Sequence, residues 1–452
     1  MSFRIQRGIV DIVGDGGGND NVPQYATLTA GVDYVAPNPT RAFFRLTNTR
    51  HGSAGQTVNS LLDFIRAYMT WVSDPTRLDQ SVQIARGGDD GITTRAAWEI
   101  VEYTGAIDGP DEFLVRQRAA LTCTSGNLTV DGSPVGVGSI SRCAVVITGQ
   151  SGDIRVNNGM ARCQFTAELV DNGDGTVTPR FTRGSSTDNA YVSYVIVEFK
   201  GANWRDVQRI ETSTVVTDIQ GTDEQHITTG NDVDIPIDLL DAQKAFLIDA
   251  QCRTSGNLNN SMDAIYLVPG LHPTAISGVN TNASYLRRSA PAAGGTRVCV
   301  AWLVESLSDD IFVTHEGIFL DNGGAYAEPQ TINYPLGFDA IDYDRAMLAG
   351  ITSTADGAVT QSPVGSINLR LTDAGHVELY RNDTIQEEYL YFSVVNLPGA
   401  VAADTSVVGE DEPVPPEAEA VLTSPLHEAD PEDEPDHEAV QNTPQIHEAD
   451  LI

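Results

Sequence analysis

Four stretches of the chain share one order of residues: a basic residue, then a small one, then apolar residues. They start at Arg41, Arg142, Lys244 and Arg345, so they lie 101, 102 and 101 positions apart. A fixed period of this length is the sequence signature of a repeated structural unit. The regular spacing therefore predicts tandem units of about 100 residues.

Three further patterns follow in the same order within each interval: an apolar or alternating stretch, a segment that ends in arginine, and a run of β-branched and aromatic residues. The clearest copies are Gln164–Val170, Pro179–Arg183 and Tyr194–Phe199. Such runs, separated by Gly, Asn, Asp and Ser, are typical of short β-strands. Some six to eight strands in 100 residues indicate an all-β fold with immunoglobulin-like or jelly-roll-like sandwiches.

A fifth strand-like pattern decides where each unit begins. It occurs at Val115–Arg118, Val207–Ile210 and Val313–Glu316, and the N-terminal segment Ile5–Ile9 resembles it, whereas no copy follows the last interval. Starting each unit with this strand gives four complete sandwiches at roughly 1–108, 109–203, 204–310 and 311–400. The alternative is that the N-terminal strand completes the fourth unit, in the same chain or in a neighbouring subunit.

We expect a simple string of these four units, shaped as a rod or an arc with small interfaces between neighbours. One segment departs from the strand pattern, because Leu61, Leu62, Ile65 and Tyr68 follow helical spacing. This spacing predicts an inserted helix at about 58–68 in the first unit.

The composition changes at Val401, where an acidic, proline-rich tail begins. Residues 401–452 contain 15 acidic residues, seven prolines and no Lys or Arg. A segment of this composition cannot bury enough apolar surface to form its own fold, so we expect it to be disordered. Three His-Glu-Ala motifs recur in it at intervals of ten. Candidate partner-docking residues are therefore His427, Glu428, His437, Glu438, His447 and Glu448. The alternative is a low-complexity repeat that serves solvation only.

Charge restricts the class of partner. The formal net charge is −35, of which the tail contributes −15 and the rest of the chain −20. Such a surplus repels phosphate, so we expect neither nucleic acid nor an anionic membrane surface as a partner. No apolar run approaches the ~20 residues of a membrane-spanning helix, and the N-terminus lacks the apolar core of a secretory signal.

No constellation typical of catalysis, of a cofactor site or of a metal site stands out. The five cysteines form no CxxC pair, and the histidines form no HExxH motif. Glutamates recur once per unit in the β-branched run, as at Glu198 and Glu305, and we expect them on a solvated or arginine-paired face. The recurrent Arg86, Arg183, Arg288 and Arg381 are the candidate partners of these glutamates. Arg41, Arg142, Lys244, Arg345, Glu198 and Glu305 are therefore interpreted as structural landmarks of the repeat.

The form of the repeat resembles a known class of proteins. The segments that carry the resemblance are Lys244–Phe246, Phe181–Ser185, Tyr194–Phe199, Val207–Arg209, Gly31–Tyr34 and Arg45–Arg50. Residues 1–400 resemble repetitive virion structural proteins of tailed bacteriophages, particularly those of short-tailed schitoviruses. The resemblance implies a non-enzymatic protein of the particle exterior, assembled in the host cytoplasm, such as a non-contractile tail sheath, and it assigns no site residues.

Several functions remain open at this point. The first is a multi-copy sheath or tail-associated protein that self-assembles into a symmetric oligomer on the tail tube and contacts the host receptor. The second is a capsid decoration protein or head fibre docked through the acidic tail. A third class is a cell-surface adhesin or carbohydrate-binding array, and a fourth is a polysaccharide depolymerase.

Overall fold

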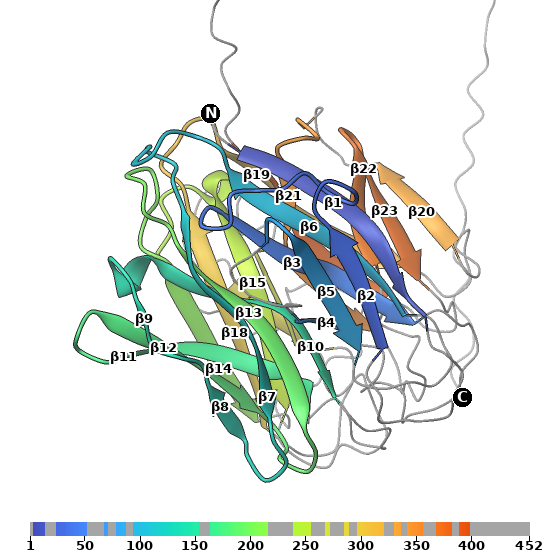
Figure 1. Cartoon of the computed structure of the whole chain (residues 1–452). Coiled ribbons are helices and arrows are strands. Elements are labelled where there is room, and N and C mark those ends of the chain that lie inside the picture. The colour runs from blue at the N-terminus through green and yellow to red at the C-terminus, as the bar shows by residue number, and fades with distance from the viewer. Residues whose placement is uncertain are drawn as a thin grey trace, which may run out of the picture. The chain divides into compact units, whose positions relative to one another are not determined.

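A computed structural model describes fourteen segments of the chain. These are residues 3–13, 24–51, 67–70, 78–86, 94–152, 163–215, 238–254, 267–271, 284–288, 296–320, 330–335, 341–355, 368–381 and 388–397. The regular elements in these segments are antiparallel β-strands and two short 3-10 helices (Figure 1). The predicted all-β fold class is therefore confirmed.

The strands fall into four successive sets, which we call units 1 to 4. Unit 1 contains β1 (Phe3–Ile12), β2 (Gln24–Thr29), β3 (Ala42–His51), β4 (Ala67–Thr70), β5 (Ser81–Arg86) and β6 (Thr94–Tyr103). Unit 2 contains β7 (Leu114–Cys123), β8 (Thr129–Asp131), β9 (Val135–Gly136), η1 (Ile140–Arg142), β10 (Cys143–Gly152), β11 (Phe165–Asp171), β12 (Thr176–Arg183) and β13 (Ala190–Glu198). Unit 3 contains β14 (Gln208–Val215), η3 (Ala242–Lys244), β15 (Ala245–Thr254), β16 (Leu267–Leu271), β17 (Ser284–Arg288) and β18 (Thr296–Glu305). Unit 4 contains β19 (Phe312–Leu320), β20 (Gln330–Pro335), β21 (Ala346–Ala355), β22 (Asn368–Asp373), β23 (His376–Arg381) and β24 (Glu388–Asn396).

Each unit has a three-stranded sheet with the same strand order. The last strand of the unit lies in the centre and pairs with the first strand on one side. On the other side it pairs with the strand that follows the basic landmark residue (β3, β10, β15 or β21), which we call the third main strand. The four sheets are β1-β6-β3, β7-β13-β10, β14-β18-β15 and β19-β24-β21. The N-terminal strand β1 thus pairs with β6 of its own unit, from Phe3 opposite Tyr103 to Ile12 opposite Thr94.

A second, smaller sheet accompanies the first one in each unit. These sheets are β2-β5-β4, β8-β12-β11 with β9 also paired to β12, the two-stranded β16-β17, and β20-β23-β22. In the second sheet of unit 2, the residues of β12 alternate between buried and partly exposed, which is the pattern of a strand with one face covered. The segments predicted as strands ending in arginine form β5, β12, β17 and β23.

The central strands are buried on both faces, which explains their long apolar runs. In β13 all residues except Tyr191 are buried, and continuous apolar sequence is expected where both faces of a sheet are covered. In β3, Phe44 packs in a core within unit 1, whereas its neighbour Phe43 packs in a core shared by all four units. In β15, Phe246 likewise packs in the shared core, whereas Leu247 packs in a core within unit 3.

The units do not form a string, so that expectation was wrong. The third main strands contact one another in a closed order: β3 contacts β10, β10 contacts β15, β15 contacts β21, and β21 contacts β3. The backbone N–H of Ile5 in unit 1 donates to the carbonyl of Asp344 in unit 4 at 2.9 Å. The physical reason is the apolar face that each three-stranded sheet turns away from its own unit. Because four such faces bury one another in a shared core, the last unit meets the first.

Two expectations fall largely outside the described residues. The helix predicted at 58–68 overlaps them only at Ala67 and Tyr68, and these two residues begin strand β4 instead. The acidic tail, with its six candidate docking residues, lies entirely outside them. Among the described residues, no helix is long and apolar enough to span a membrane.

Candidate functional site

The most regular cluster of polar side chains lies where the units join. At this end of the sheets, the first strands begin, the last strands end and the third main strands begin. Segments 104–113, 199–207 and 306–311 connect successive units here. We call this region the linker end.

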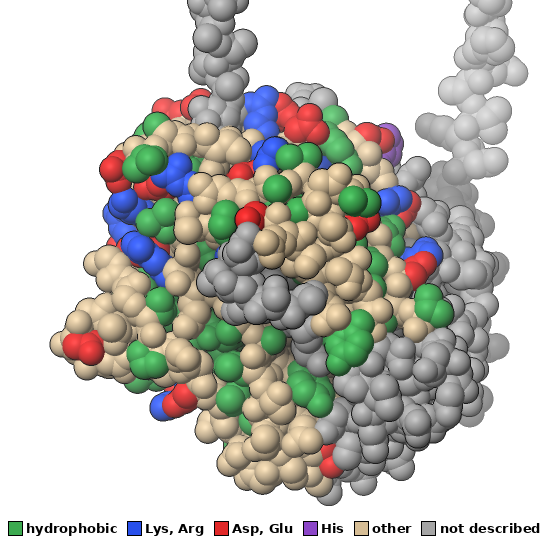
Figure 2. Space-filling view, viewed as in Figure 1, with side chains coloured by type: hydrophobic (Ala, Val, Ile, Leu, Met, Phe, Trp, Pro, Cys, Tyr) green, Lys and Arg blue, Asp and Glu red, His purple; other side chains and the backbone are tan. Residues whose placement is uncertain are grey.

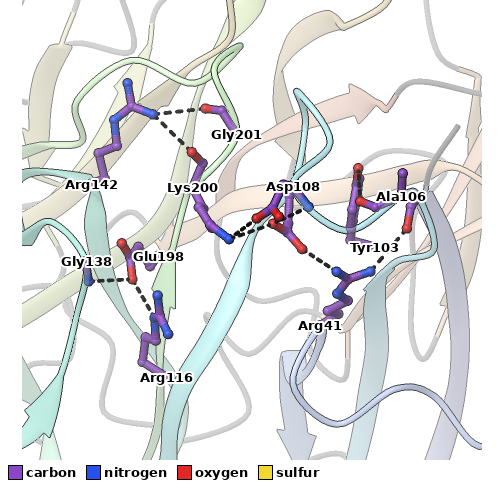
Figure 3. Close-up of polar contacts among 12 residues, drawn as sticks. Arg41, Tyr103, Ala106, Asp108, Arg116, Gly138, Arg142, Glu198, Lys200 and Gly201 are labelled. Atoms are coloured by element: carbon purple, nitrogen blue, oxygen red, sulfur yellow. Dashed lines mark hydrogen bonds and ion pairs between the residues drawn. The ribbon is translucent and has the colours of Figure 1, made fainter.

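A buried glutamate lies at or next to the end of the last strand in three of the four units. Glu198 accepts hydrogen bonds from Arg116 Nε at 2.5 Å and from the backbone N–H groups of Gly138 and Ser139 at 3.1 Å each (Figure 3). Glu305 accepts from the N–H groups of Leu240 at 2.8 Å and Asp241 at 2.6 Å, and it pairs with Arg205. These carboxylates therefore fix the loop that precedes the third main strand.

Glu102 repeats the arrangement in unit 1, and unit 4 departs from it. Glu102 pairs with Arg4 at 2.5 Å and accepts the N–H of Asn38 at 2.8 Å. In unit 4 the same register position holds Asn396, whose Oδ1 accepts the N–H of Asp342 at 3.3 Å. Phe312, 45% exposed, lies opposite Asn396, where unit 1 has Arg4 opposite Glu102.

Of the two expected alternatives for these glutamates, a solvated or an arginine-paired face, the structure shows the arginine-paired one. Glu99, Glu102, Glu198 and Glu305 are each at most 5% exposed. Their partners come from the first or third main strand or, for Arg205, from the linker before the first strand, rather than from the predicted arginine-ended segments. Arg183 instead is buried and donates to the carbonyls of Asn127, Thr124 and Asp188. The side chains of Arg86, Arg288 and Arg381 lie outside the described set.

The main chains of the four basic landmark residues accept equivalent hydrogen bonds. Each carbonyl accepts the N–H of a residue at the end of the last strand or directly after it. The bonds are Tyr103 to Arg41 at 2.8 Å, Phe199 to Arg142 at 2.9 Å, Ser306 to Lys244 at 3.0 Å and Leu397 to Arg345 at 3.1 Å. This bond closes each three-stranded sheet at the linker end, which explains the period of the landmark in the sequence.

The side chains of Arg41, Arg142 and Lys244 bind the linkers, whereas Arg345 binds the loop before its own strand. Arg41 donates to Glu112 Oε1 at 2.5 Å and to the carbonyl of Gly105 at 3.1 Å, while Arg142 donates to the carbonyl of Gly201 at 2.9 Å (Figure 3). Lys244 pairs with Asp309 at 2.6 Å, and Arg345 pairs with Asp342.

Lys200 connects the first linker to the second. It pairs with Asp108 and lies 3.4 Å from Glu112 (Figure 3). The hydrogen bond from Lys200 lowers the pKa of the Asp108 carboxyl and raises that of the lysine. Because both side chains are largely exposed, solvent screens this pair strongly.

The same backbone hydrogen bond occurs at two junctions, the one between units 1 and 2 and the one between units 4 and 1. Val115 N–H donates to the carbonyl of Thr40 at 2.9 Å, and this bond matches the one from Ile5 to Asp344. Arg118, which is 6% exposed, donates to the carbonyls of Pro39 and Ala42.

The corresponding arginine at the junction of units 4 and 1 is Arg7. It donates to the carbonyls of Tyr343 and Ala346, two positions that correspond to Pro39 and Ala42. Val207 N–H donates to the carbonyl of Ser141 at 2.7 Å between units 2 and 3, and β19 contacts η3 between units 3 and 4. Successive units therefore meet head to tail in a closed cycle.

A buried polar network lies where the third main strands meet. Arg45 pairs with Glu99 at 2.9 Å, and Arg7 approaches the same glutamate at 3.5 Å. Asp249 of unit 3 accepts the N–H of Ile147 of unit 2 at 2.7 Å. Burial raises the pKa of Asp249 to about 6 despite its hydrogen bonds and the charge of Arg45.

The arrangement described here positions and fastens segments of the chain. The buried carboxylates of Glu102, Glu198 and Glu305 accept hydrogen bonds from guanidinium groups and backbone N–H groups. In the described segments, no three His, Cys, Asp or Glu side chains lie together in a way that could hold a metal ion. Cys123, Cys143 and Cys163 are buried.

Sequence reasoning found the landmark residues but missed Arg4, Arg7, Arg116, Arg118 and Arg205. The available signal was the recurrence of arginine in or just before the first strand of units 1 to 3. Arg4, Arg116 and Arg205 pair with glutamates, whereas Arg7 and Arg118 donate to carbonyl groups that no sequence pattern marks. No protein-family model matches the chain, and no curated protein matches it significantly.

Proposed function

We propose that this protein is a non-enzymatic structural component of a bacteriophage particle. In this proposal many copies lie on the particle exterior, where they form a non-contractile sheath or another tail-associated layer. Its partners are further copies of itself and other virion proteins of the tail tube, with host-receptor contact as an additional role. Nucleic acid and membrane are not among the proposed partners.

The observation that carries the proposal is the repeated head-to-tail contact between units, including the contact from the last unit to the first. Buried arginines donate to main-chain carbonyls at these junctions, and all four units contribute to one shared apolar core. Such a body keeps its surfaces in fixed positions relative to one another, which a component of a symmetric array requires. The resemblance of residues 1–400 to repetitive virion proteins supports the same function.

A second candidate is a capsid decoration protein or head fibre. It is favoured by the acidic tail, whose three His-Glu-Ala motifs are suited to docking on a basic groove of a shell protein. Sheath and decoration differ only in where the protein lies on the particle.

Antibody labelling of purified particles, viewed by electron microscopy, tests both candidates. We expect label along the tail; label confined to the head would favour the decoration protein. Particles without the protein would refute both. A variant that ends at Val401 tests the tail separately, because unchanged incorporation into particles would refute docking through the His-Glu-Ala motifs.

A further inference from the structure

The linker end gathers most of the exposed large apolar side chains of the described residues. Among all the described residues, ten large apolar side chains are exposed, and six of these lie at the linker end. The six are Val35, Ile107, Ile140, Leu240, Leu307 and Phe312. Single exposed apolar residues are ordinary, but a concentration at one end of a body is typical of an interaction surface.

Hydrogen bonds between the linkers make these positions parts of one continuous surface. The N–H groups of Gly201 and Asn203 donate to the carbonyls of Glu112 and Pro110, both at 2.8 Å. Leu307 N–H donates to the carbonyl of Asn203 at 2.6 Å. The linker that carries Ile107 therefore lies against the second linker, which in turn lies against the linker that carries Leu307.

The loops of the units complete this surface. Leu240 is tied to the end of β18 through Glu305, and Val35 is tied to β1 through a hydrogen bond from its N–H to Gln6 at 2.6 Å. The positions are fixed by backbone groups, so the apolar side chains are presented on a pre-formed surface.

The outermost charged groups on the same surface are carboxylates. Six aspartates of the linker end are exposed: Asp108, Asp206, Asp238, Asp309, Asp310 and Asp344. The side chain of Asp309 is 99% exposed and that of Asp238 is 80% exposed. The basic residues that pair with them are less exposed: the side chains of Lys244 and Arg205 are 21% and 22% exposed, and that of Lys200 is 40% exposed. Figure 2 shows charged side chains of both signs concentrated in the upper half of the view.

We propose that the linker end is a docking surface for a different protein, one whose contact surface has apolar side chains surrounded by Lys and Arg. The exposed aspartates select a basic rim, because complementary charge favours encounter and like charge opposes it. The linker end of a second copy does not fit, since it would bring the same exposed aspartates against each other. The acidic tail, with its 15 acidic residues, is repelled for the same reason.

This inference rests on the proposed function in one respect: the partner is a neighbouring component of the particle. Photo-cross-linking in assembled particles tests it, with p-benzoylphenylalanine placed at Ile107 or at Leu240 of the full chain. The matched control carries the same group at Leu128, which is 49% exposed and lies beyond the opposite end of β7. We expect both linker-end positions to cross-link to one and the same particle protein, and the control position not to do so.

Binding to that purified protein then measures the chemistry of the contact. We expect Leu240→Ser combined with Leu307→Ser to weaken binding about tenfold or more, and Leu128→Ser to change it less than about twofold. Raising the salt concentration from about 50 to about 500 mM should weaken binding at least about fivefold, because the ionic rim is screened. Unchanged affinity in the double variant or in high salt would overturn the proposal.

Cross-links only to a second copy or to residues 402–452, or none above the level of the Leu128 control, would equally overturn it. The two proposals fail separately. If antibody labels the particles but the linker end yields no cross-link, the docking surface is refuted and the structural function stands. If purified particles lack the protein while the linker end binds a basic cellular protein through Leu240 and Leu307, the proposed virion function is refuted instead.

Discussion

Replacement of Asp249 by asparagine should remove one specific part of the pH dependence of stability. The carboxylate follows a register shift in β15 and is partly buried where the third main strands meet. Its Oδ2 accepts the N–H of Ile147 from unit 2 and Nε2 of Gln251, both at 2.7 Å, and Oδ1 accepts the N–H of Ala250 at 3.0 Å. The positive charge of Arg45, which itself pairs with Glu99, lowers the pKa of Asp249 but does not offset the effect of burial.

The direction of the effect follows from the pKa values of the two states. Burial raises the pKa of Asp249 from 3.8 to about 6 in the folded protein. The folded state therefore binds this proton more tightly than the unfolded state, and stability falls as the pH rises from about 4 to about 6. A shift of about two pKa units corresponds to about 3 kcal/mol, all of it lost above pH 6.

The amide introduced by Asp249→Asn keeps a side-chain oxygen that accepts the N–H of Ile147, but it cannot ionise. We therefore expect the free energy of unfolding of this variant, relative to the original protein, to rise by about 3 kcal/mol between about pH 4 and about pH 7. Urea unfolding, followed by the fluorescence of the four tryptophans, measures this difference. Other titrating groups cancel because they are common to both proteins.

Asp131→Asn is the matched control. Asp131 pairs with Arg180 at 2.8 Å on the surface, and this hydrogen bond lowers its pKa. The free energy of unfolding of Asp131→Asn, relative to the original protein, should therefore fall as the pH rises, by less than about 1 kcal/mol. A difference between Asp249→Asn and the original protein that stays constant from about pH 4 to about pH 7 would refute the argument from burial.

Four further substitutions test how the units and their linkers are held together. Arg7→Ala and Arg118→Ala should each lower the free energy of unfolding by about 3 kcal/mol, since each leaves two carbonyl groups without their donor. Glu198→Gln should cost about 2 kcal/mol, because the charge-assisted bonds from Arg116 and two N–H groups become neutral. Gly201→Ala should cost at least about 2 kcal/mol, because its Cβ would overlap the carbonyl of Pro110, whereas Gly136→Ala meets no neighbour and should be nearly neutral. Urea unfolding at neutral pH measures all of them.

Each substitution has an outcome that contradicts it. If Arg7→Ala were neutral while Arg118→Ala was costly, the contact between units 4 and 1 would not contribute as the matching contact does. Equal stabilities of Glu198→Gln and the original protein would mean that the buried carboxylate is dispensable. Equal effects of Gly201→Ala and Gly136→Ala would show that the two linkers are not packed against each other.

The strands were predictable because their determinants are local. Alternating or apolar runs bounded by turn residues mark β5, β6, β12, β13 and β23 in the sequence, and the basic landmark precedes the third main strand in every unit. The landmark recurs because its carbonyl receives the closing N–H of the last strand, as Arg41 does from Tyr103.

The closed order of the units was not predictable from these local patterns, although one signal pointed to it. Runs such as Ala144–Ile147 and Tyr194–Phe199 lack the alternation that a sheet with one solvated face requires. A sandwich in a string would cover only one face of each sheet, so the second apolar face needed another partner. The sequence does not show which unit supplies that partner, since the bonds between units run from side chains such as Arg7 and Arg118 to carbonyl groups.

The closure also explains why unit 4 tolerates its departures at Phe312 and Asn396. In units 1 to 3 the paired arginine and glutamate fix the loop before the third main strand, and in unit 4 the N–H of Asp342 is held by Asn396 alone. That loop gains a second support from unit 1, because Ile5 donates to Asp344 and Arg7 donates to Tyr343. The aromatic ring of Tyr343 lies 4.3 Å from the guanidinium of Arg7, which adds a cation–π contact. The first unit therefore stabilises the loop that the fourth unit holds less firmly, so the contact between the chain's first and last units is part of the fold of unit 4.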